Sequence, residues 1–206
     1  TGLDYVGVTF TDSKKGSDLL LLSRENIVGK NRSKYYTQTC YGYYPASAEL
    51  FERMEFALTG EMPKANNEIC ITQYILEQMN IGGIVLYKYD EDLPDTLNYK
   101  TVTLMPDNTR TAKALVEQQF FIKLSNDYWK IVGVIDTNAD KAGEFNSLKP
   151  SDKYSENKQE LLEADCVEYF RYGYHSIGYI SKNKYDDIVK AHIADMESWN
   201  SFGIPA

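Results

Sequence analysis

The sequence is poor in the residues from which metal centres and disulfide scaffolds are built. Its 206 residues include two histidines and three cysteines, Cys40, Cys70 and Cys166. The cysteines lie far apart without a C-x-x-C or any other metal-ligand spacing, and their odd number leaves at least one thiol outside an intramolecular disulfide. We expect all three to act as small buried apolar side chains. The pattern indicates no metal site and no other cofactor.

Long apolar runs and basic clusters are missing as well. The longest apolar runs, at 19–22 and 131–135, are far shorter than the ~20 residues that a membrane-spanning helix needs. The chain carries 22 basic and 30 acidic side chains, a formal charge of -8, and no run of basic residues longer than two. This balance argues against nucleic acid and anionic lipid surfaces as partners. Because Thr1 stands where a start methionine is expected and no signal-type segment follows, we interpret the chain as an excised piece of a longer protein.

Tyrosine is the residue in excess. The sequence has 17 tyrosines against 8 phenylalanines and 2 tryptophans, and a side chain with a broad apolar face and a polar tip suits partner surfaces more than deep cores. We predict a partner-binding surface in two aromatic stretches, with core packing of half or more of these side chains as the alternative. The residues are Tyr35, Tyr36, Tyr41, Tyr43, Tyr44, Tyr169, Phe170, Tyr172 and Tyr174.

Local patterns predict strands and helices in irregular alternation. Ser47 and Thr72 are candidate N-caps, Gly60 and Gly82 stand where helices are expected to end, and Asn183 begins a capping-box pattern. The predicted elements are strands at 4–10 and 17–22, a helix at 48–58, a strand at 68–71, a helix at 73–79, strands at 84–89 and 100–104, a hairpin of 119–124 with 128–135, a helix at 155–162, strand-like residues at 166–180 and a last helix from 184.

These elements indicate an α+β fold. The hairpin is antiparallel, and the nearly continuous apolar run at 131–135 predicts a central strand that is buried on both faces. Since strands and helices do not alternate regularly as they do in a doubly wound sheet, we expect a mixed, largely antiparallel sheet with packed helices. The length fits a single domain over 1–206, or two intimately packed lobes, with an exposed polar excursion at 138–165.

No catalytic motif in the sequence is complete. The run Gly173–Gly178 has one residue too many between its glycines for a nucleophile elbow. Acidic groups such as Asp90–Asp92, or Asp136 with Asp140, are typical of solvated loop charge. We therefore predict that the protein is not an enzyme, and the alternative is a hydrolase with an unrecognised carboxylate pair or Cys/His site.

Three segments, taken together, resemble one protein family. Residues 57–72 contain the pattern G-x-x-P-x-x-x-N-E-I-x-I-T and lead into a helix and a glycine step, residues 128–137 contain K-I-V-G-V-I, and residues 180–189 form a closing strand and helix. In this order and spacing they resemble the extracytoplasmic, MacB-like periplasmic core domain of FtsX/MacB-type ABC-transporter permeases. The motif residues, which we expect to be structural, are Gly60, Pro63, Asn67, Glu68, Ile69, Gly82 and Gly133.

The resemblance implies a non-catalytic role outside the cytoplasm. Such domains sit between transmembrane helices of dimeric permeases, and a cytoplasmic ATPase subunit or domain drives helix movements that reach them. The implied partners are the protein's own transmembrane helices, the ATPase, a second copy, and an extracellular peptide, lipoprotein or cell-envelope protein. The implied location is the extracellular face of the cytoplasmic membrane, periplasmic in a Gram-negative organism. Without the family, the alternative is a secreted carbohydrate- or peptide-binding module that uses the tyrosines as a stacking platform.

Overall fold

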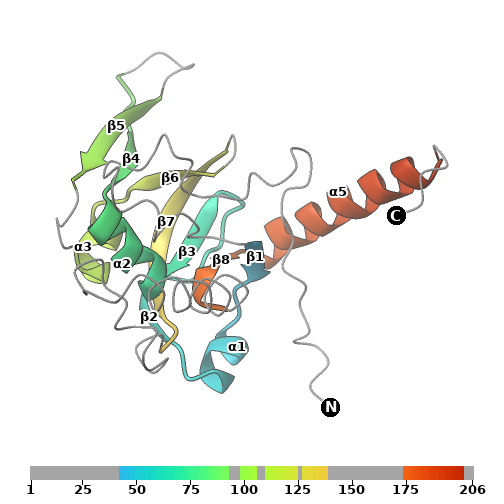
Figure 1. Ribbon diagram of the computed structural model, residues 1–206, viewed down its shortest axis with the longest axis horizontal. Helices are drawn as coiled ribbons and strands as arrows, with labels where there is room; N and C mark the ends of the chain where they lie inside the picture. The colour runs from blue at the N-terminus through green and yellow to red at the C-terminus, as the bar shows by residue number, and fades with distance from the viewer. Residues whose placement is uncertain (1–41, 93–97, 106–109, 125–126, 139–173, 202–206) are drawn as a thin grey trace, which may run out of the picture.

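The protein has the predicted α+β fold, with one mixed, mostly antiparallel sheet of eight strands and a few short helices (Figure 1). The computed structural model describes residues 42–92, 98–105, 110–124, 127–138 and 174–201. The strands follow the order β1-β8-β3-β7-β6-β4-β5, with β2 also paired to β7. They are β1 (Gly42–Pro45), β2 (Ala57–Gly60), β3 (Glu68–Thr72), β4 (Ile84–Tyr89), β5 (Tyr99–Leu104), β6 (Phe121–Leu124), β7 (Asp127–Asp136) and β8 (Ile177–Ile180).

Strand β7 lies at the centre of the sheet, as the apolar run at 131–135 predicts. Strand β3 runs parallel to it along one edge, from Glu68 opposite Lys130 to Thr72 opposite Ile135. Strands β6 and β2 share the other edge, both antiparallel, with β6 beside the first part of β7 and β2 beside the last part. The predicted 119–124/128–135 hairpin is therefore confirmed as the β6–β7 pair.

Helices cover the two faces of the sheet unevenly. They are α1 (Ala48–Arg53), α2 (Gln73–Gly82), α3 (Ala112–Glu117), the short 3₁₀ turn η4 (Tyr174–Ser176) and α5 (Lys182–Ser201). Leu76 of α2 and Leu115 of α3 are fully buried in the same core cluster as Leu86 and Trp129 of the sheet. Helix α1 packs through Phe51 in a smaller cluster. Removing such a side chain from water contributes about 1.5–3 kcal/mol, so this packing holds the sheet.

Several local signals act as predicted. The Thr72 side chain caps α2 by accepting a hydrogen bond from the Ile75 amide at 3.1 Å, and Ser47 caps α1 by accepting one from the Leu50 amide at 3.0 Å. Helix α2 ends at Gly82, and Gly83 follows with φ 71, the left-handed backbone that glycine adopts without strain. These caps set the start of each helix because a polar side chain satisfies an amide with no partner inside the helix.

The predicted helix at 48–58 is wrong in its second half. Helix α1 ends at Arg53, Glu55 turns the chain with φ 55, and Ala57–Gly60 continue as strand β2. Gly60 is therefore not a helix end but the last residue of a strand. The apolar residue Leu58, which fits a helical stripe, packs instead with the cluster around Phe51, because pairing with β7 outweighs a weak local helix preference.

The last helix begins two residues earlier than its capping pattern predicts. Ser181 accepts a hydrogen bond from the Lys184 amide at 3.3 Å, so Ser181 takes the capping role and Asn183 lies inside α5. Strand β1 and helix α3 are elements that the sequence analysis did not predict. The predicted strands at 4–10 and 17–22, the helix at 155–162 and residues 139–165 of the excursion lie outside the described residues.

Candidate functional site

The residues of the family-like motif form a tight joint between β2, β3 and β7. Gly60 lies opposite Gly133 in the β2–β7 register. A Cβ atom on Gly60 would come within 2.4 Å of the Val132 carbonyl oxygen, and one on Gly133 within 2.7 Å of the Cys70 sulfur. Both glycines are therefore required by a close approach of chains, and Gly60 also needs its φ of 105. Gly60 is thus held by strand pairing and not by the helix end that the sequence pattern predicts.

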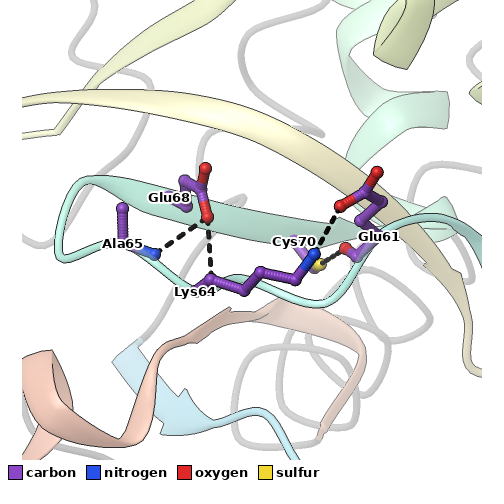
Figure 2. A network of polar contacts seen from close by, with 5 residues as sticks. All are labelled: Glu61, Lys64, Ala65, Glu68 and Cys70. Atoms are coloured by element: carbon purple, nitrogen blue, oxygen red, sulfur yellow. Dashed lines mark hydrogen bonds and ion pairs between the residues drawn. The ribbon is translucent and has the colours of Figure 1, made fainter.

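The loop that follows Gly60 is held by the side chain of Glu68, as Figure 2 shows. The Glu68 carboxylate accepts hydrogen bonds from the amides of Lys64 and Ala65 at 2.7 and 2.9 Å. The exposed Lys64 ammonium lies 2.8 Å from Glu61, which lowers the pKa of the Glu61 carboxyl. An exposed pair of this kind adds little stability. The carboxylate that caps two loop amides therefore does most of the ordering.

Three more motif residues belong to the same joint, whereas Gly82 lies apart from it at the end of α2. Pro63 is buried in the loop, and Ile69 is fully buried in the core from strand β3. Asn67 contributes its backbone carbonyl, which accepts a hydrogen bond from the Lys130 amide at 2.7 Å, while its side chain is exposed. Together these contacts join β2 and β3 to opposite edges of the same strand.

Of the tyrosines predicted to bind a partner, three lie in the described part of the chain. Tyr43 is 7% exposed and stacks on Trp129 with ring centroids 5.2 Å apart, so it belongs to the core. Tyr44 is half-buried between Tyr179 and Tyr185. Tyr174 is 39% exposed. The remaining members, Tyr35, Tyr36, Tyr41, Tyr169, Phe170 and Tyr172, lie outside the described residues.

A different set of rings gathers on one face of the sheet. We call Tyr87, Tyr89, Tyr99, Phe121 and Tyr128 the aromatic face. Cross-strand register puts Tyr87 opposite Phe121 and Tyr89 opposite Tyr99, and residues opposite each other share a face. The rings of Tyr99 and Tyr128 stack with centroids 4.0 Å apart, and Tyr87 meets Tyr128 edge-on at 5.0 Å. The set is continuous across four strands.

The aromatic face lies opposite the packed core. Ile84 and Leu86 alternate with Tyr87 along β4 and are fully buried on the side that α2 and α3 cover. None of the five rings belongs to either buried core cluster, and Tyr89 is 52% exposed. Partial burial raises the pKa of Tyr99, and nearby phenol groups add to the effect. The Tyr99 phenol therefore stays a neutral hydrogen-bonding group near neutral pH.

Sequence reasoning missed this surface because its residues are spread along the chain. The alternation of Tyr87 and Tyr89 with Ile84 and Leu86 in the predicted strand is a signal that both tyrosines share one side. The partner strands that bring Tyr99 and Tyr128 beside them depend on register, which the sequence does not specify.

The nucleophile-elbow candidate is buried. Ser176 is fully buried in the turn η4, which leads into a strand and not into a helix. The neighbouring His175 is 2% exposed; its Nδ1 lies 2.8 Å from Thr137 Oγ1, and its backbone carbonyl accepts a hydrogen bond from Thr72 Oγ1. Burial lowers the pKa of His175 to about 4. The neutral, enclosed imidazole therefore links η4 to the residue after β7, and the backbone carbonyl of His175 links it to the end of β3.

Three of the acidic residues in the described part of the chain, Asp90, Asp136 and Asp186, have local partners. Asp90 and Asp136 accept hydrogen bonds from amides two residues later, and Asp186 pairs with Lys182 at 2.6 Å. Within the described ranges, no group of three or more His, Cys, Asp or Glu side chains is placed to hold a metal ion. Cys70 is buried, as predicted, and its thiol is free. Burial raises the pKa of this thiol to about 12.

The comparisons with known proteins add no relative. No family model, curated protein or solved structure matches the sequence. In the part of the chain that the structure describes, no helix has the length and apolar content to cross a membrane. The permease resemblance therefore depends on the motif residues themselves.

Proposed function

We propose that this chain is the extracytoplasmic domain of an FtsX/MacB-type ABC-transporter permease. In this proposal the domain catalyses no reaction. It recognises a ligand or partner outside the cytoplasmic membrane, and the ATP-driven movement of membrane helices reaches it through α5.

The observation that carries this proposal is the geometry of α5. Figure 1 shows the helix leaving the β1–β8 end of the sheet and extending away from the body of the protein. Its first turns are fixed to the core, since Tyr185 is 8% exposed and Ile188 and Val189 pack against the same cluster. Further along, Ile193 is 49% exposed. A continuous helix of 20 residues is about 30 Å long, so displacement of its far part would move the sheet.

The three family-like segments also converge in space, which supports the proposal. The first contains β2 and β3, the second is most of β7, and the third starts with the last residue of β8 and continues into α5. Strand β3 lies between β7 and β8, with Cys70 opposite both Gly133 and Tyr179. Strand β3, which carries part of the motif, thus connects the central strand β7 to β8, the strand that leads into α5.

The proposal predicts ATP-dependent movement of the domain in the complete permease. We would place a fluorophore at Lys113→Cys, an exposed α3 site, in the full-length protein with its ATPase in nanodiscs, and measure energy transfer to a lipid dye. We expect ATP to change the transfer efficiency, and Ala191→Pro, on an exposed position of α5, to abolish the change, because proline breaks a helix interior.

Ala191→Ser is the matched control, since serine keeps the helix, and it should retain the response to ATP. An ATP response that is absent, or that survives Ala191→Pro unchanged, contradicts the proposal that α5 transmits the movement of the membrane helices to the domain.

A second candidate is a secreted carbohydrate- or peptide-binding module, which the partly exposed aromatic face favours. Such a module needs neither transmembrane helices nor an ATPase. The same preparation separates the two, because a secreted module would not purify with membranes or with an ATPase subunit.

A further inference from the structure

A pocket opens beside the aromatic face, where β4 separates from β6. It has a volume of about 580 Å³ and lies between the end of β4, the turn from α3 to β6, and β7. This is within the range of roughly 300–1,000 Å³ that small-molecule sites occupy. Two of its walls are the rings of Tyr89 and Phe121, so the pocket and the aromatic face are continuous.

The chemistry of the lining is unusual. Apart from the two rings, the walls consist of amide and charged side chains: Gln118, Gln119, Lys88, Lys130 and Glu117. The lining contains no branched aliphatic side chain, so it offers little to a lipid tail or an aliphatic peptide side chain. A pyranose ring places C–H groups on its faces and hydroxyls around its edge, and this combination matches aromatic walls with polar groups beside them.

Several of these polar groups are arranged to serve a ligand. Glu117 is paired with Lys113 at 3.7 Å. The side-chain oxygen Oε1 of Gln118 accepts a hydrogen bond from the Arg110 guanidinium at 3.2 Å, so the side-chain nitrogen of Gln118 is left to donate to other acceptors. Among the described residues, Lys130 has no carboxylate within ion-pair distance. The mixed, partly neutralised charge favours a polyhydroxylated ligand over a highly charged one.

The backbone of Gln119 gives an independent reason to look here. Gln119 follows the last residues of α3 with φ 51, the left-handed conformation that usually selects glycine at a helix end. Strained positions of this kind cluster where a side chain serves a site. Because the strain could be relieved by glycine, the amide side chain of Gln119 is a candidate for a role in binding.

We propose that this pocket binds a saccharide, with a sugar ring against Tyr89 and Phe121 and its hydroxyls bonded to Gln118, Gln119 and Lys130. The inference names a ligand class for the recognition proposed above and depends on that proposal for its biological setting. Saccharide binding by the purified chain can nevertheless be tested alone.

The experiment titrates the purified 206-residue chain with the neutral oligosaccharides cellotetraose, chitotetraose and maltotetraose by isothermal calorimetry. We expect at least one to bind with a Kd of about 1 mM or tighter. Tyr89→Ala should weaken binding about tenfold through loss of the stacking ring. Met105→Ala is the control, because it truncates another exposed apolar side chain, on the residue after β5. This variant should leave the Kd unchanged.

The variant Gln119→Gly distinguishes a loss of binding from a loss of stability, because the two are expected to change in opposite directions. Relief of the left-handed strain should raise Tm by about 2–4 °C, while loss of the amide should weaken binding about fivefold. The proposal is overturned if none of the three saccharides binds, if Tyr89→Ala and Gln119→Gly both leave the Kd unchanged, or if a tetra-alanine peptide binds in their place. These failures leave the membrane proposal standing, and a missing ATP response in the permease leaves the saccharide site standing.

Discussion

Replacing Gly60 by alanine is expected to lower the free energy of unfolding by about 4 kcal/mol. The new Cβ would lie 2.4 Å from the Val132 carbonyl oxygen, a backbone atom that cannot rotate away. The φ of 105 adds strain for any residue with a side chain. Overpacking costs about 1–3 kcal/mol and a left-handed backbone roughly 1–2 kcal/mol. Urea unfolding monitored by circular dichroism measures the change.

The neighbouring residue provides the control. Thr59 is exposed in the same strand, and Thr59→Ala should cost less than about 1 kcal/mol. For Gly133→Ala, the nearest atoms are the side-chain ends of Cys70 and Leu58 at 2.7 and 2.8 Å. Adding Cys70→Ala should recover part of the loss, which a double-mutant cycle detects. A cost for Gly60→Ala no larger than that of Thr59→Ala would refute the proposed joint.

The second large effect is a loss of stability in acid that depends on His175. Its imidazole has a folded-state pKa of about 4 against an ordinary value of 6.5. Below pH 6.5 the unfolded chain binds a proton at this residue and the folded chain does not, so stability is full above pH 6.5 and falls as the pH drops toward 4. The linked loss over this window is about 3 kcal/mol.

Urea unfolding from pH 8 to pH 4 measures this slope. His175→Asn keeps a polar group near Thr137 but does not titrate, so we expect its stability to vary with pH by about 3 kcal/mol less than that of the wild type. NMR titration of the imidazole of His175 gives the pKa independently. If His175 titrates near 6.5, or if the unfolding free energy depends on pH equally in the wild type and in His175→Asn, the assignment of a buried neutral imidazole is wrong.

Local sequence signals predicted an element correctly wherever several of them coincided. For α2, the Thr72 cap, the stripe of Ile75, Leu76 and Met79, and the glycine end all agree, and the structure buries the three apolar side chains completely. Similarly, the antiparallel hairpin and the central strand follow from apolar runs of the right length. The α+β class follows from these elements together.

Other features depend on contacts between distant segments. Helix α3 has six residues, less than two full turns, so the periodicity around Leu115 is too short to read. In the site, the sequence analysis favoured stretches where tyrosines are dense along the chain, whereas Tyr87, Tyr99 and Tyr128 come from three strands and meet through strand register. Density along the sequence is a poor guide to a surface assembled across a sheet.

The central claim is that this domain lies outside the cytoplasmic membrane. It is tested by labelling the full-length protein in intact spheroplasts with a membrane-impermeant maleimide. The variant carries Lys113→Cys, on an α3 side chain 78% exposed, with Cys40→Ser and Cys166→Ser. Cys70 is the internal control, because its buried thiol, with a pKa raised to about 12, should react only after denaturation.

The account predicts that the cysteine at position 113 is labelled to the same extent in intact and in lysed spheroplasts. Labelling that occurs only after lysis would place the domain in the cytoplasm and contradict the central claim.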